Sequence, residues 1–486
     1  MNIGIRRIGI GVVVLMLILI GNLTYLQIID ANNLKANPNN KRAVLRDFNH
    51  ARGEILTSDN EVAARSVAVK DGTDFKFQRE YPLGALMSQI VGVQSFNLGN
   101  TGVERTYNDA LAGQEPDLQL HNIRDFFSDK PTIGNVRLTI SANLQRLAQS
   151  QLGNQRGAVV LLDTHTGAIL AMYSTPSIDL AALAGHNPKA VQDYFTFINN
   201  APSNPSLPRA YRETFPPGSS FKIVTAAVAT EDGKAPPDRQ FPVLSSLKLP
   251  QTTGTLSNFG GERCGGNLLE SFVHSCNTTF GQLGLDLGDD LVTGIERFGI
   301  DQTPPLDLIP GAVASAGPQP GTFRDNQPKF AQAAIGQNDV RVTPLQMALV
   351  AAAVGNGGVI MKPHVMADIT DRKGEVVRSY DPEPWLQAMD NQTAQLVGSF
   401  MTEVVRRGTG TAAQAPNVTI AGKTGTAQTA PGEAPHAWFA AFAPAEQPRY
   451  AVAVLVEHGG NSGNDATGGR VAAPIARAML LAALGR

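Results

Sequence analysis

The sequence predicts an α+β protein whose main domain holds an antiparallel sheet of about five strands with helices on both faces. Two observations predict this class. Apolar, strand-like runs lie at both ends of residues 141–486, and a block of helix-like stretches separates them. Strands that meet from both ends of a segment, around helices, are typical of α+β domains. A membrane helix and a small α+β pedestal are expected before this domain.

Length and composition restrict the possible functions. The chain has 486 residues, so we expect two folded units, each large enough to bury a core. Hydrophobic residues make up 42% and charged residues 17%, as in an ordinary globular protein. The net charge of -2 gives no electrostatic reason to expect nucleic acid as a ligand. Because the sequence has no CxxC pair and no Cys/His cluster, we expect neither a metal nor a cofactor.

The N-terminal region has the features of a membrane anchor. No side chain from Ile8 to Ile29 is charged, and about 20 such residues span a bilayer as a helix. A signal peptide would have a shorter run and a cleavage site, and Arg6 and Arg7 favour a membrane segment over a buried helix. We expect a single-pass anchor at residues 8–29 after a short tail, residues 1–7. Basic residues also follow the anchor, so charge alone leaves its orientation open.

Two further parts follow the anchor. The residues directly after it are polar and rich in asparagine, as in a tether. From Asn49 to about Thr139, glycine and aspartate interrupt short strand-like pieces, which indicates a small α+β module. We assign the tether and this pedestal to residues 30–140, and the main domain to residues 141–486.

The elements of the main domain follow from its apolar patterns. Two apolar runs around a Thr-His-Thr-Gly turn predict a hairpin at 158–163 and 168–173. Helix-like stretches are expected next, at 221–230, 268–287 and 344–354. Three more strands are expected at 419–426, 437–442 and 450–457, with an alanine-rich helix at 470–484.

The segment Phe215-Pro-Pro-Gly-Ser-Ser-Phe-Lys222 holds the first candidate catalytic residues. Its Pro-Pro-Gly turn can start a helix at Ser219, which places Ser219 and Lys222 three apart on one helical face. Serine needs a nearby base to act as a nucleophile, and a lysine in a desolvated or cationic site can lose its proton to serve as one. Alone the signal is weak, since Ser-x-x-Lys arises about once or twice by chance in such a chain.

A second candidate group is Ser275-Cys276-Asn277. The hydroxyl of Ser275 can relay a proton between a lysine and a leaving group, and the carboxamide of Asn277 can hold a substrate peptide bond. Taken alone, Ser-x-Asn is more often a cap or turn between helices.

The third group is Gly422-Lys-Thr-Gly-Thr426, on a predicted strand. Alternation puts Lys423 and Gly425 on one face and Thr424 and Thr426 on the other. Gly425 lets a substrate lie close to the strand. Lys423 supplies positive charge, the two threonines can bind a terminal carboxylate, and a backbone N–H is available to a tetrahedral intermediate.

The chain has two cysteines, Cys264 and Cys276, close together in the sequence. In an exported domain they can form a disulfide that closes a short loop around the second motif. From the residues alone, two free buried thiols are an equally open interpretation.

Ser-x-x-Lys, Ser-x-Asn and Lys-Thr-Gly, in this order, resemble the motif set of the penicillin-binding protein and serine β-lactamase superfamily. The segments 157–177, 335–348 and 436–444 are similar to the flanking segments of that superfamily. Upstream, Arg52-Gly-Glu-Ile55 and residues 102–113 resemble the pedestal motifs of class B penicillin-binding proteins. Within that class the chain is most similar to the short PbpA-like proteins of actinobacteria.

The resemblance implies a peptidoglycan D,D-transpeptidase that acts in cell wall synthesis and division and is inhibited by β-lactam acylation. Ser219 would attack the D-Ala-D-Ala bond of a stem peptide and release D-Ala. The amine of a neighbouring stem peptide would then resolve the acyl-enzyme.

The resemblance also implies residue roles and a location. Lys222 would be the base, Ser275 the proton relay, Asn277 an amide clamp and Lys423 an electrostatic aid. Thr424 and Thr426 would bind the carboxylate beside Gly425, and the backbone N–H groups of Ser219 and Thr426 would form the oxyanion hole. Because the substrate lies outside the membrane, the N-terminus would be cytoplasmic and the catalytic domain extracytoplasmic. A SEDS-type glycosyltransferase, FtsW- or RodA-like, is the implied membrane partner.

Other interpretations are weaker. Gly408-Thr-Gly-Thr-Ala-Ala413 matches a dinucleotide-binding loop, but a helix-like stretch precedes it where a strand is needed. His274 beside Ser275 suggests a Ser-His pair, but no Gly-x-Ser-x-Gly elbow surrounds it. The anchor and pedestal disfavour a secreted β-lactamase, whereas D,D-carboxypeptidase activity stays open. All three motifs are intact, which gives a non-catalytic sensor no support, and residues 30–140 are too few for a glycosyltransferase domain.

Overall fold

The computed structural model describes residues 3–26, 47–70, 72, 74–116, 118, 133–323, 325–430 and 432–486. Helix α1, Ile3–Thr24, contains a stretch, Gly4–Thr24, that is long and apolar enough to cross a membrane. The helix therefore contains the predicted anchor from residue 8 to Thr24, where the helix ends. The predicted tether, residues 30–46, lies outside the described residues.

A five-stranded antiparallel sheet forms the centre of the main domain, in the order β17-β18-β19-β7-β8. Strands β19 and β7 pair in register from Tyr450 opposite Asp163 to Val456 opposite Gly157, which joins the two ends of the domain. This confirms the predicted sheet and fold class. The strands are β7 Gly157–Asp163, β8 Ile169–Thr175, β17 Ala421–Ala427, β18 His436–Ala443 and β19 Tyr450–Val456.

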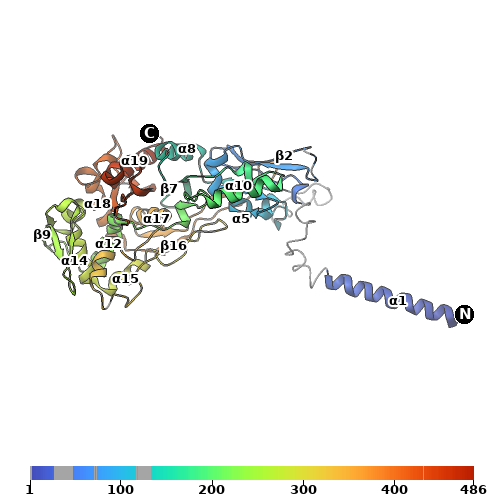
Figure 1. Cartoon of the computed structure of the whole chain (residues 1–486), viewed down its shortest axis with the longest axis horizontal. Coiled ribbons are helices and arrows are strands. Elements are labelled where there is room, and N and C mark those ends of the chain that lie inside the picture. The colour runs from blue at the N-terminus through green and yellow to red at the C-terminus, as the bar shows by residue number, and fades with distance from the viewer. Residues whose placement is uncertain are drawn as a thin grey trace. The chain divides into compact units, whose positions relative to one another are not determined.

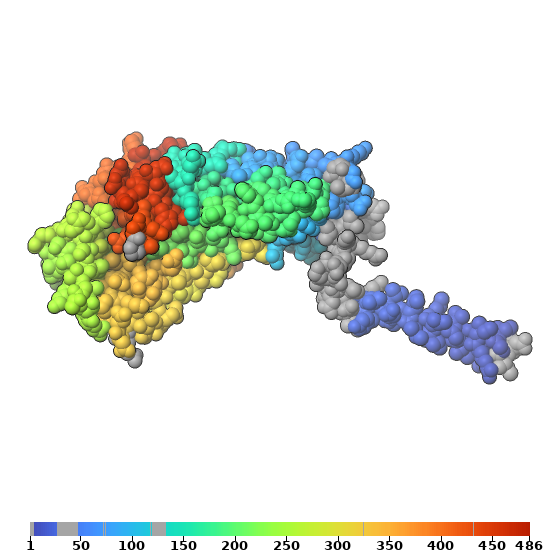
Figure 2. Space-filling model, in the orientation of Figure 1, coloured from blue at the N-terminus to red at the C-terminus, as the bar shows by residue number. Residues whose placement is uncertain are grey.

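Helices cover both faces of this sheet, so residues that alternate along a strand enter two different cores. Val160 and Leu162 of β7 belong to one core, and Val159 and Leu161 to the other. Helix α17, Pro344–Gly355, packs on the first face. Helices α8, Ala142–Leu152, and α19, Ala473–Ala483, cover the second and lie side by side (Figure 1). The same teal and red segments adjoin in Figure 2.

The helices between the two groups of strands carry the first two motifs. The Pro-Pro-Gly turn leads into a 3₁₀ turn, Gly218–Phe221, and then into α12, Lys222–Glu231. The predicted helical stretch 268–287 is divided into α13, Leu268–Val273, and α14, Asn277–Leu287. The break falls at Ser275, whose φ of 58° lies in the left-handed region that a continuing helix cannot use.

A six-stranded sheet, in the order β15-β14-β6-β1-β2-β3, forms the pedestal. Strands β14 and β15 come from the sequence between α17 and the later helix α18, Asn391–Arg407, and β14 pairs antiparallel with β6. A hairpin from late in the chain thus completes the pedestal sheet. The strands are β1 Ile55–Leu56, β2 Val62–Ala68, β3 Phe77–Glu80, β6 Asn135–Leu138, β14 Met366–Thr370 and β15 Val376–Ser379.

The remaining elements are shorter. They include α5 Gly102–Thr106, α6 Asn108–Leu111, α10 Pro188–Asn200, β9 Phe241–Leu244, β10 Ser246–Lys248, β11 Thr255–Ser257, β12 Cys264–Gly266, α15 Asp289–Glu296, α16 Pro328–Ala333, β13 Val359–Met361 and β16 Pro384–Gln387. Six of their strands form separate two-stranded sheets, β10 with β11, β12 with β9 and β13 with β16.

A buried ion cluster stabilises the pedestal. The carboxylate of Glu104 accepts hydrogen bonds from Arg79 at 2.6 Å and from Arg52 at 3.2 Å, and all three side chains are buried. Two buried guanidinium groups therefore share one carboxylate. Removing one member of a buried charge cluster leaves the others uncompensated, which is a large energetic cost.

We predict that Glu104→Gln lowers the free energy of unfolding of the full chain in detergent by about 3 to 5 kcal/mol, because it removes the negative charge that two buried arginines share. Chemical denaturation measures the loss. Glu80→Gln is the matched control, since Glu80 pairs with Arg65 at the surface and such a pair contributes about 1 kcal/mol or less. Equal losses in the two variants would contradict the prediction.

Candidate active site

The 3₁₀ turn that carries Ser219 packs directly against β17. Lys222 donates its backbone N–H to the carbonyl of Ser219, and residues three apart in such a turn project from the same side. Gly218 has a φ of 52°, and a Cβ added to it would lie 2.6 Å from the carbonyl oxygen of Thr426. Only glycine fits this close approach. Ser219 is half-buried, and its hydroxyl makes no hydrogen bond with any residue that the structure describes.

Lys222 has no exposed surface. Its Nζ donates to the Ser275 carbonyl at 2.7 Å and to the Asn277 Oδ1 at 2.8 Å, and lies 3.2 Å from the Ser275 Oγ. The ring of Phe280 covers it, with 5.4 Å between the Nζ and the ring centroid. Burial, and then the nearby charge of Lys423, hold the pKa of Lys222 well below the ordinary lysine value.

Lys423 is equally buried and reaches the same serine from β17. Its Nζ donates to the Ser275 Oγ at 2.9 Å and to the Thr424 carbonyl at 3.2 Å, with the ring of Phe272 5.6 Å away. Burial lowers the pKa of Lys423 to about 7. Near neutral pH, this pair of amines therefore exchanges protons readily, which an exposed lysine does not do.

Ser275 links the two amines. The structure brings Lys222, Ser275 and Lys423 together, as the motif spacing predicts, from a helix, an inter-helix loop and a strand. The left-handed backbone of Ser275 exposes its carbonyl to one lysine while its hydroxyl contacts both. A hydroxyl can accept from one neighbour and donate to another, so this one can pass a proton between an amine and a third group.

Asn277 is more constrained than its predicted role requires. Its Oδ1 accepts from Lys222, and its Nδ2 donates to the carbonyl of Ser257 in β11 at 2.9 Å. A carboxamide has two N–H donors and an oxygen with two lone pairs, so one N–H and one lone pair of Asn277 are left for a ligand. The side chain thus also positions Lys222.

The Lys-Thr-Gly motif occupies β17, an edge strand of the sheet. A Cβ on Gly425 would lie 2.6 Å from the Pro217 carbonyl oxygen and 3.0 Å from the Ser220 nitrogen, so glycine lets the nucleophile turn contact the strand. Thr424 is buried, whereas Thr426 is half-buried beside the turn. Lys423 and Gly425 face the same side, as alternation predicts.

Thr409 is a site residue that the sequence analysis did not identify. Its hydroxyl lies 2.6 Å from that of Thr424, and it follows directly after α18. It belongs to the Gly-Thr-Gly-Thr stretch that was considered only as a dinucleotide-binding loop. The stretch follows a helix and not a strand, so it does not have the position of a dinucleotide-binding loop, and its Thr409 contacts Thr424 of β17 instead. The sequence does show a hydroxyl-rich stretch here, with Thr409 14 residues before the lysine of the third motif. That spacing alone does not reveal that the two segments are in contact.

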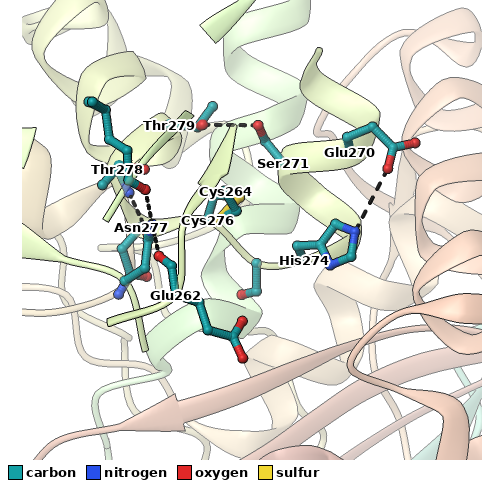
Figure 3. The surroundings of a disulfide bond; sticks show 12 residues. Glu262, Cys264, Glu270, Ser271, His274, Cys276, Asn277, Thr278 and Thr279 are labelled. Carbon is teal, nitrogen blue, oxygen red and sulfur yellow. Dashed lines mark hydrogen bonds and ion pairs between the residues drawn. A yellow bond between two sulfur atoms is a disulfide. The ribbon is translucent and has the colours of Figure 1, made fainter. Parts of the chain in front are cut away.

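A disulfide between Cys264 and Cys276 adjoins the second motif, with the two sulfurs 2.11 Å apart. It connects β12 to the loop that carries Ser275 and Asn277 (Figure 3). Thr278, next along the chain, donates its backbone N–H to the Asn258 Oδ1 at 2.9 Å. The loop is therefore held at several points. His274 lies between the two helices, and Figure 3 shows its ring directed toward Glu270, 3.8 Å away, so it is not part of a Ser-His pair.

Comparisons of the chain with known protein families and solved structures agree with this geometry. Residues 157–481 match the family described as penicillin-binding protein transpeptidase domain, and residues 52–136 match the penicillin-binding protein A dimerisation domain. The chain therefore belongs to the penicillin-binding protein transpeptidases, which confirms the resemblance seen in its motifs.

Individual relatives are similar along the whole chain. The peptidoglycan D,D-transpeptidases PbpA of Mycolicibacterium smegmatis and Mycobacterium tuberculosis are each 38% identical to it over 100% of this chain and 99% of theirs. The penicillin-binding protein A of M. tuberculosis, solved as a ceftriaxone acyl-enzyme complex, superposes with a TM-score of 0.83 at 34% identity. That structure covers 90% of this chain and 100% of its own. The penicillin G acyl-enzyme gives a TM-score of 0.81 at 36% identity, with the same coverage.

We predict that thiol alkylation of the native protein, purified without reductant, leaves both Cys264 and Cys276 unmodified, and that both react after reduction and unfolding, because the bond consumes both thiols. Mass spectrometry of the peptides containing the two cysteines measures the modification. Alkylation of both residues in the unfolded but unreduced protein would exclude the bond.

Proposed function

We propose that the chain is a peptidoglycan D,D-transpeptidase in which Ser219 is the nucleophile. The observation that carries the proposal is the pair of buried lysine amines on either side of the Ser275 hydroxyl, next to the turn that presents Ser219. Neither amine has a carboxylate partner among the described residues, so burial shifts each toward its neutral form, and a neutral amine is a base.

In the first half-reaction, the neutral amine of Lys222 takes the proton of the Ser219 hydroxyl. The Ser219 oxygen bonds to the carbonyl carbon of the penultimate D-Ala. The C–N bond to the terminal D-Ala then breaks, and the proton passes through Ser275 to the leaving nitrogen. Free D-Ala leaves, and the donor stem peptide stays attached to Ser219 as an ester.

The second half-reaction reverses these proton transfers. An amine of a neighbouring stem peptide loses a proton through the same groups and attacks the ester carbon. The ester C–O bond breaks, a new amide bond forms, and Ser219 recovers its proton. Hydrolysis by water would follow the same path, so D,D-carboxypeptidase activity is the expected side reaction.

The edge position of β17 explains how a donor peptide is held. An edge strand has unpaired backbone groups that can accept an extended peptide. The backbone N–H groups of Ser219 and Thr426 are suited to an oxyanion hole, since the turn and the strand touch at this point. Thr424 and Thr426 are suited to the terminal carboxylate, whose negative charge favours the protonated form of the nearby Lys423, and the free N–H of Asn277 is suited to the peptide carbonyl.

The relatives support this proposal. The two PbpA proteins are peptidoglycan D,D-transpeptidases by name, and the penicillin-binding protein A of M. tuberculosis forms an acyl-enzyme with penicillin G. We infer that β-lactams acylate Ser219 in the same way. The proposal also includes a cytoplasmic N-terminus, an extracytoplasmic catalytic domain at 141–486, a pedestal within 30–140, and a SEDS-type glycosyltransferase partner in the membrane.

We predict that a fluorescent penicillin labels the wild-type chain at Ser219 and that Ser219→Ala abolishes the label, because the acyl bond forms to that oxygen. Gel fluorescence and peptide mass spectrometry measure it. Ser220→Ala is the matched control, since this buried neighbour only donates to the Pro217 carbonyl, at 2.8 Å, and its loss should leave labelling in place. A label that persists in Ser219→Ala would refute the assignment.

We predict that the acylation rate constant no longer changes with pH between about pH 8 and pH 9, because burial holds the pKa of the base, Lys222, well below the ordinary lysine value and the amine is already neutral there. Stopped-flow labelling from acidic to mildly alkaline pH measures the profile. An unperturbed lysine, with a pKa of about 10.4, would instead give a rate that still climbs tenfold per pH unit between about pH 8 and pH 9.

We predict that the full chain, given lipid-linked peptidoglycan precursor and a SEDS-type polymerase, produces cross-linked stem peptides, and that Ser219→Ala produces none. Chromatography of the digested polymer measures the dimers. Trimmed monomers without dimers, together with rapid loss of bound penicillin and steady turnover of the antibiotic, would identify a hydrolase instead.

A further inference from the structure

One surface loop is fastened at both ends to the loop that holds the second motif. At its start, the carbonyl of Ser257 accepts a hydrogen bond from the Asn277 Nδ2 at 2.9 Å. At its end, the disulfide joins Cys264 to Cys276. We call residues 258–262, which lie between these two attachments, the rim loop. The rim loop is therefore held in place next to the catalytic groups.

The side chain of Asn258 also fixes the rim loop from within. Its Oδ1 accepts the backbone N–H of Thr278 at 2.9 Å, and its Nδ2 donates to the carbonyl of Glu262 at 3.0 Å. The same Nδ2 donates to the carbonyl of Leu244 in β9 at 2.8 Å. Asn258 is buried and thus binds the motif loop, β9 and the far end of the rim loop at once.

Two exposed side chains lie on the rim loop, one apolar and one acidic. The side chain of Phe259 is 67% exposed. Glu262 is exposed, and its carboxylate makes no ion pair or hydrogen bond with any residue in the described part of the chain. The adjacent cation, Arg263, donates instead to the carbonyl of Val243 at 3.2 Å. The carboxylate of Glu262 is therefore free to bind a ligand.

The carboxylate of Glu262 borders the active site. Figure 3 shows this carboxylate and the carboxamide of Asn277 directed to the same side of the motif loop. The carboxamide binds the Nζ of Lys222, so this is the side on which the catalytic amines lie.

The rim loop and β17 lie against different parts of the motif loop. Lys423 of β17 contacts the hydroxyl of Ser275, whereas Ser257, directly before the rim loop, contacts Asn277. A donor peptide that lies along the edge of β17 leaves the rim loop uncovered. The rim loop is then available to the second substrate, the acceptor that attacks the ester of Ser219.

The acceptor reaches the site as a cation. An aliphatic amine has a pKa of about 10, like lysine, and is an ammonium group at neutral pH. A protonated lysine in the site repels this group, and an exposed carboxylate at the entrance offsets the repulsion and raises the local concentration of the acceptor. In the transfer, the acceptor nitrogen bonds to the ester carbon and the C–O bond to Ser219 breaks. The ammonium group loses two protons, one to the Ser219 oxygen and one to water.

We propose that the rim loop binds the acceptor, with Glu262 attracting its ammonium group and Phe259 packing against the aliphatic chain that carries it. The ligand class is a primary alkylammonium. An aromatic ring suits this ligand, because it offers apolar surface to methylene groups and its face attracts a cation. The proposal rests on the function proposed above and adds two residues that determine acceptor specificity.

The test follows the fate of one acyl-enzyme. The full chain in detergent receives a single donor peptide that ends in D-Ala-D-Ala, with ethylamine or n-hexylamine as the acceptor. Chromatography gives the ratio of the amide product to the hydrolysed donor. Water is uncharged and competes for the same ester, so this ratio separates recognition of the amine from acylation. We expect n-hexylamine to give a ratio about 3- to 10-fold above that of ethylamine, because its longer chain covers more apolar surface.

Glu262→Gln should lower the ratio for both amines by about two- to fivefold, as expected for an exposed charge pair, and Glu262→Asp should keep most of it. Raising the ionic strength from about 0.01 M to about 1 M should lower the wild-type ratio to that of Glu262→Gln and leave the variant unchanged, because salt screens exposed charges. A merely structural role of Glu262 predicts no such difference in salt dependence.

Phe259→Ala should remove the preference for n-hexylamine. Two exposed residues on other elements provide the matched controls. Phe197 on α10 is 69% exposed, and Glu296 on α15 is an exposed carboxylate. Phe197→Ala and Glu296→Gln should both keep the wild-type ratios.

Penicillin G separates failure of this inference from failure of the proposed function, because it acylates the enzyme without an acceptor. If penicillin labels Ser219 but neither amine gives an amide product, or if Glu262→Gln keeps the wild-type ratios, the inference is wrong. An unchanged preference for n-hexylamine in Phe259→Ala would overturn the role of the ring. If penicillin does not label Ser219 in the wild type, the proposed function itself fails.

Discussion

The burial of two lysines around one serine hydroxyl is the interaction on which the site depends. Lys222 and Lys423 have no exposed surface, and among the described residues neither has a carboxylate partner. A buried, unpaired ammonium group is strongly disfavoured, and a protein relieves that cost by deprotonation and by hydrogen bonds to the amine. Here the carbonyls of Ser275 and Thr424 and the Oδ1 of Asn277 supply those hydrogen bonds. The same burial that costs stability makes a base available.

The surrounding fold holds these amines in place. Lys423 projects from the edge strand of a sheet whose strands are almost wholly buried, and Lys222 begins a helix whose residues are buried through most of its length. Glycines at 218 and 425 allow the turn and the strand to touch. On the remaining side, the loop with Ser275 is held by the disulfide and by Asn258. Three elements that are far apart in the sequence are thereby fixed within hydrogen-bond distance of one oxygen.

The sequence predicted the sheet because its five strands are apolar runs with clear turns, and both ends of the domain carry them. It predicted the two lysines and Ser275 because each lies in a short motif whose residue types and spacing can be recognised in the sequence. It could not predict that the β14–β15 hairpin completes the pedestal sheet, since pairing between β6 and β14 depends on contacts more than 200 residues apart. The left-handed backbone of Ser275 was equally hidden, because serine rarely adopts that conformation and no local sequence pattern signals it.

Residues that act through tertiary contacts had no local signal either. Thr409 touches Thr424 only because α18 ends beside β17. Threonine is common on any surface. Such a residue is found from the structure, where its hydroxyl contact can be seen.

Titration of the lysine amines by NMR tests the burial of the pair most directly. The full chain, labelled at the lysine side chains and compared with Lys222→Met and Lys423→Met for assignment, gives the pKa of each amine in the resting protein. We expect both to titrate well below the ordinary lysine value, with Lys423 near 7. If both titrate near about 10.4, like exposed lysines, neither amine is a base at neutral pH and the proposed chemistry is wrong.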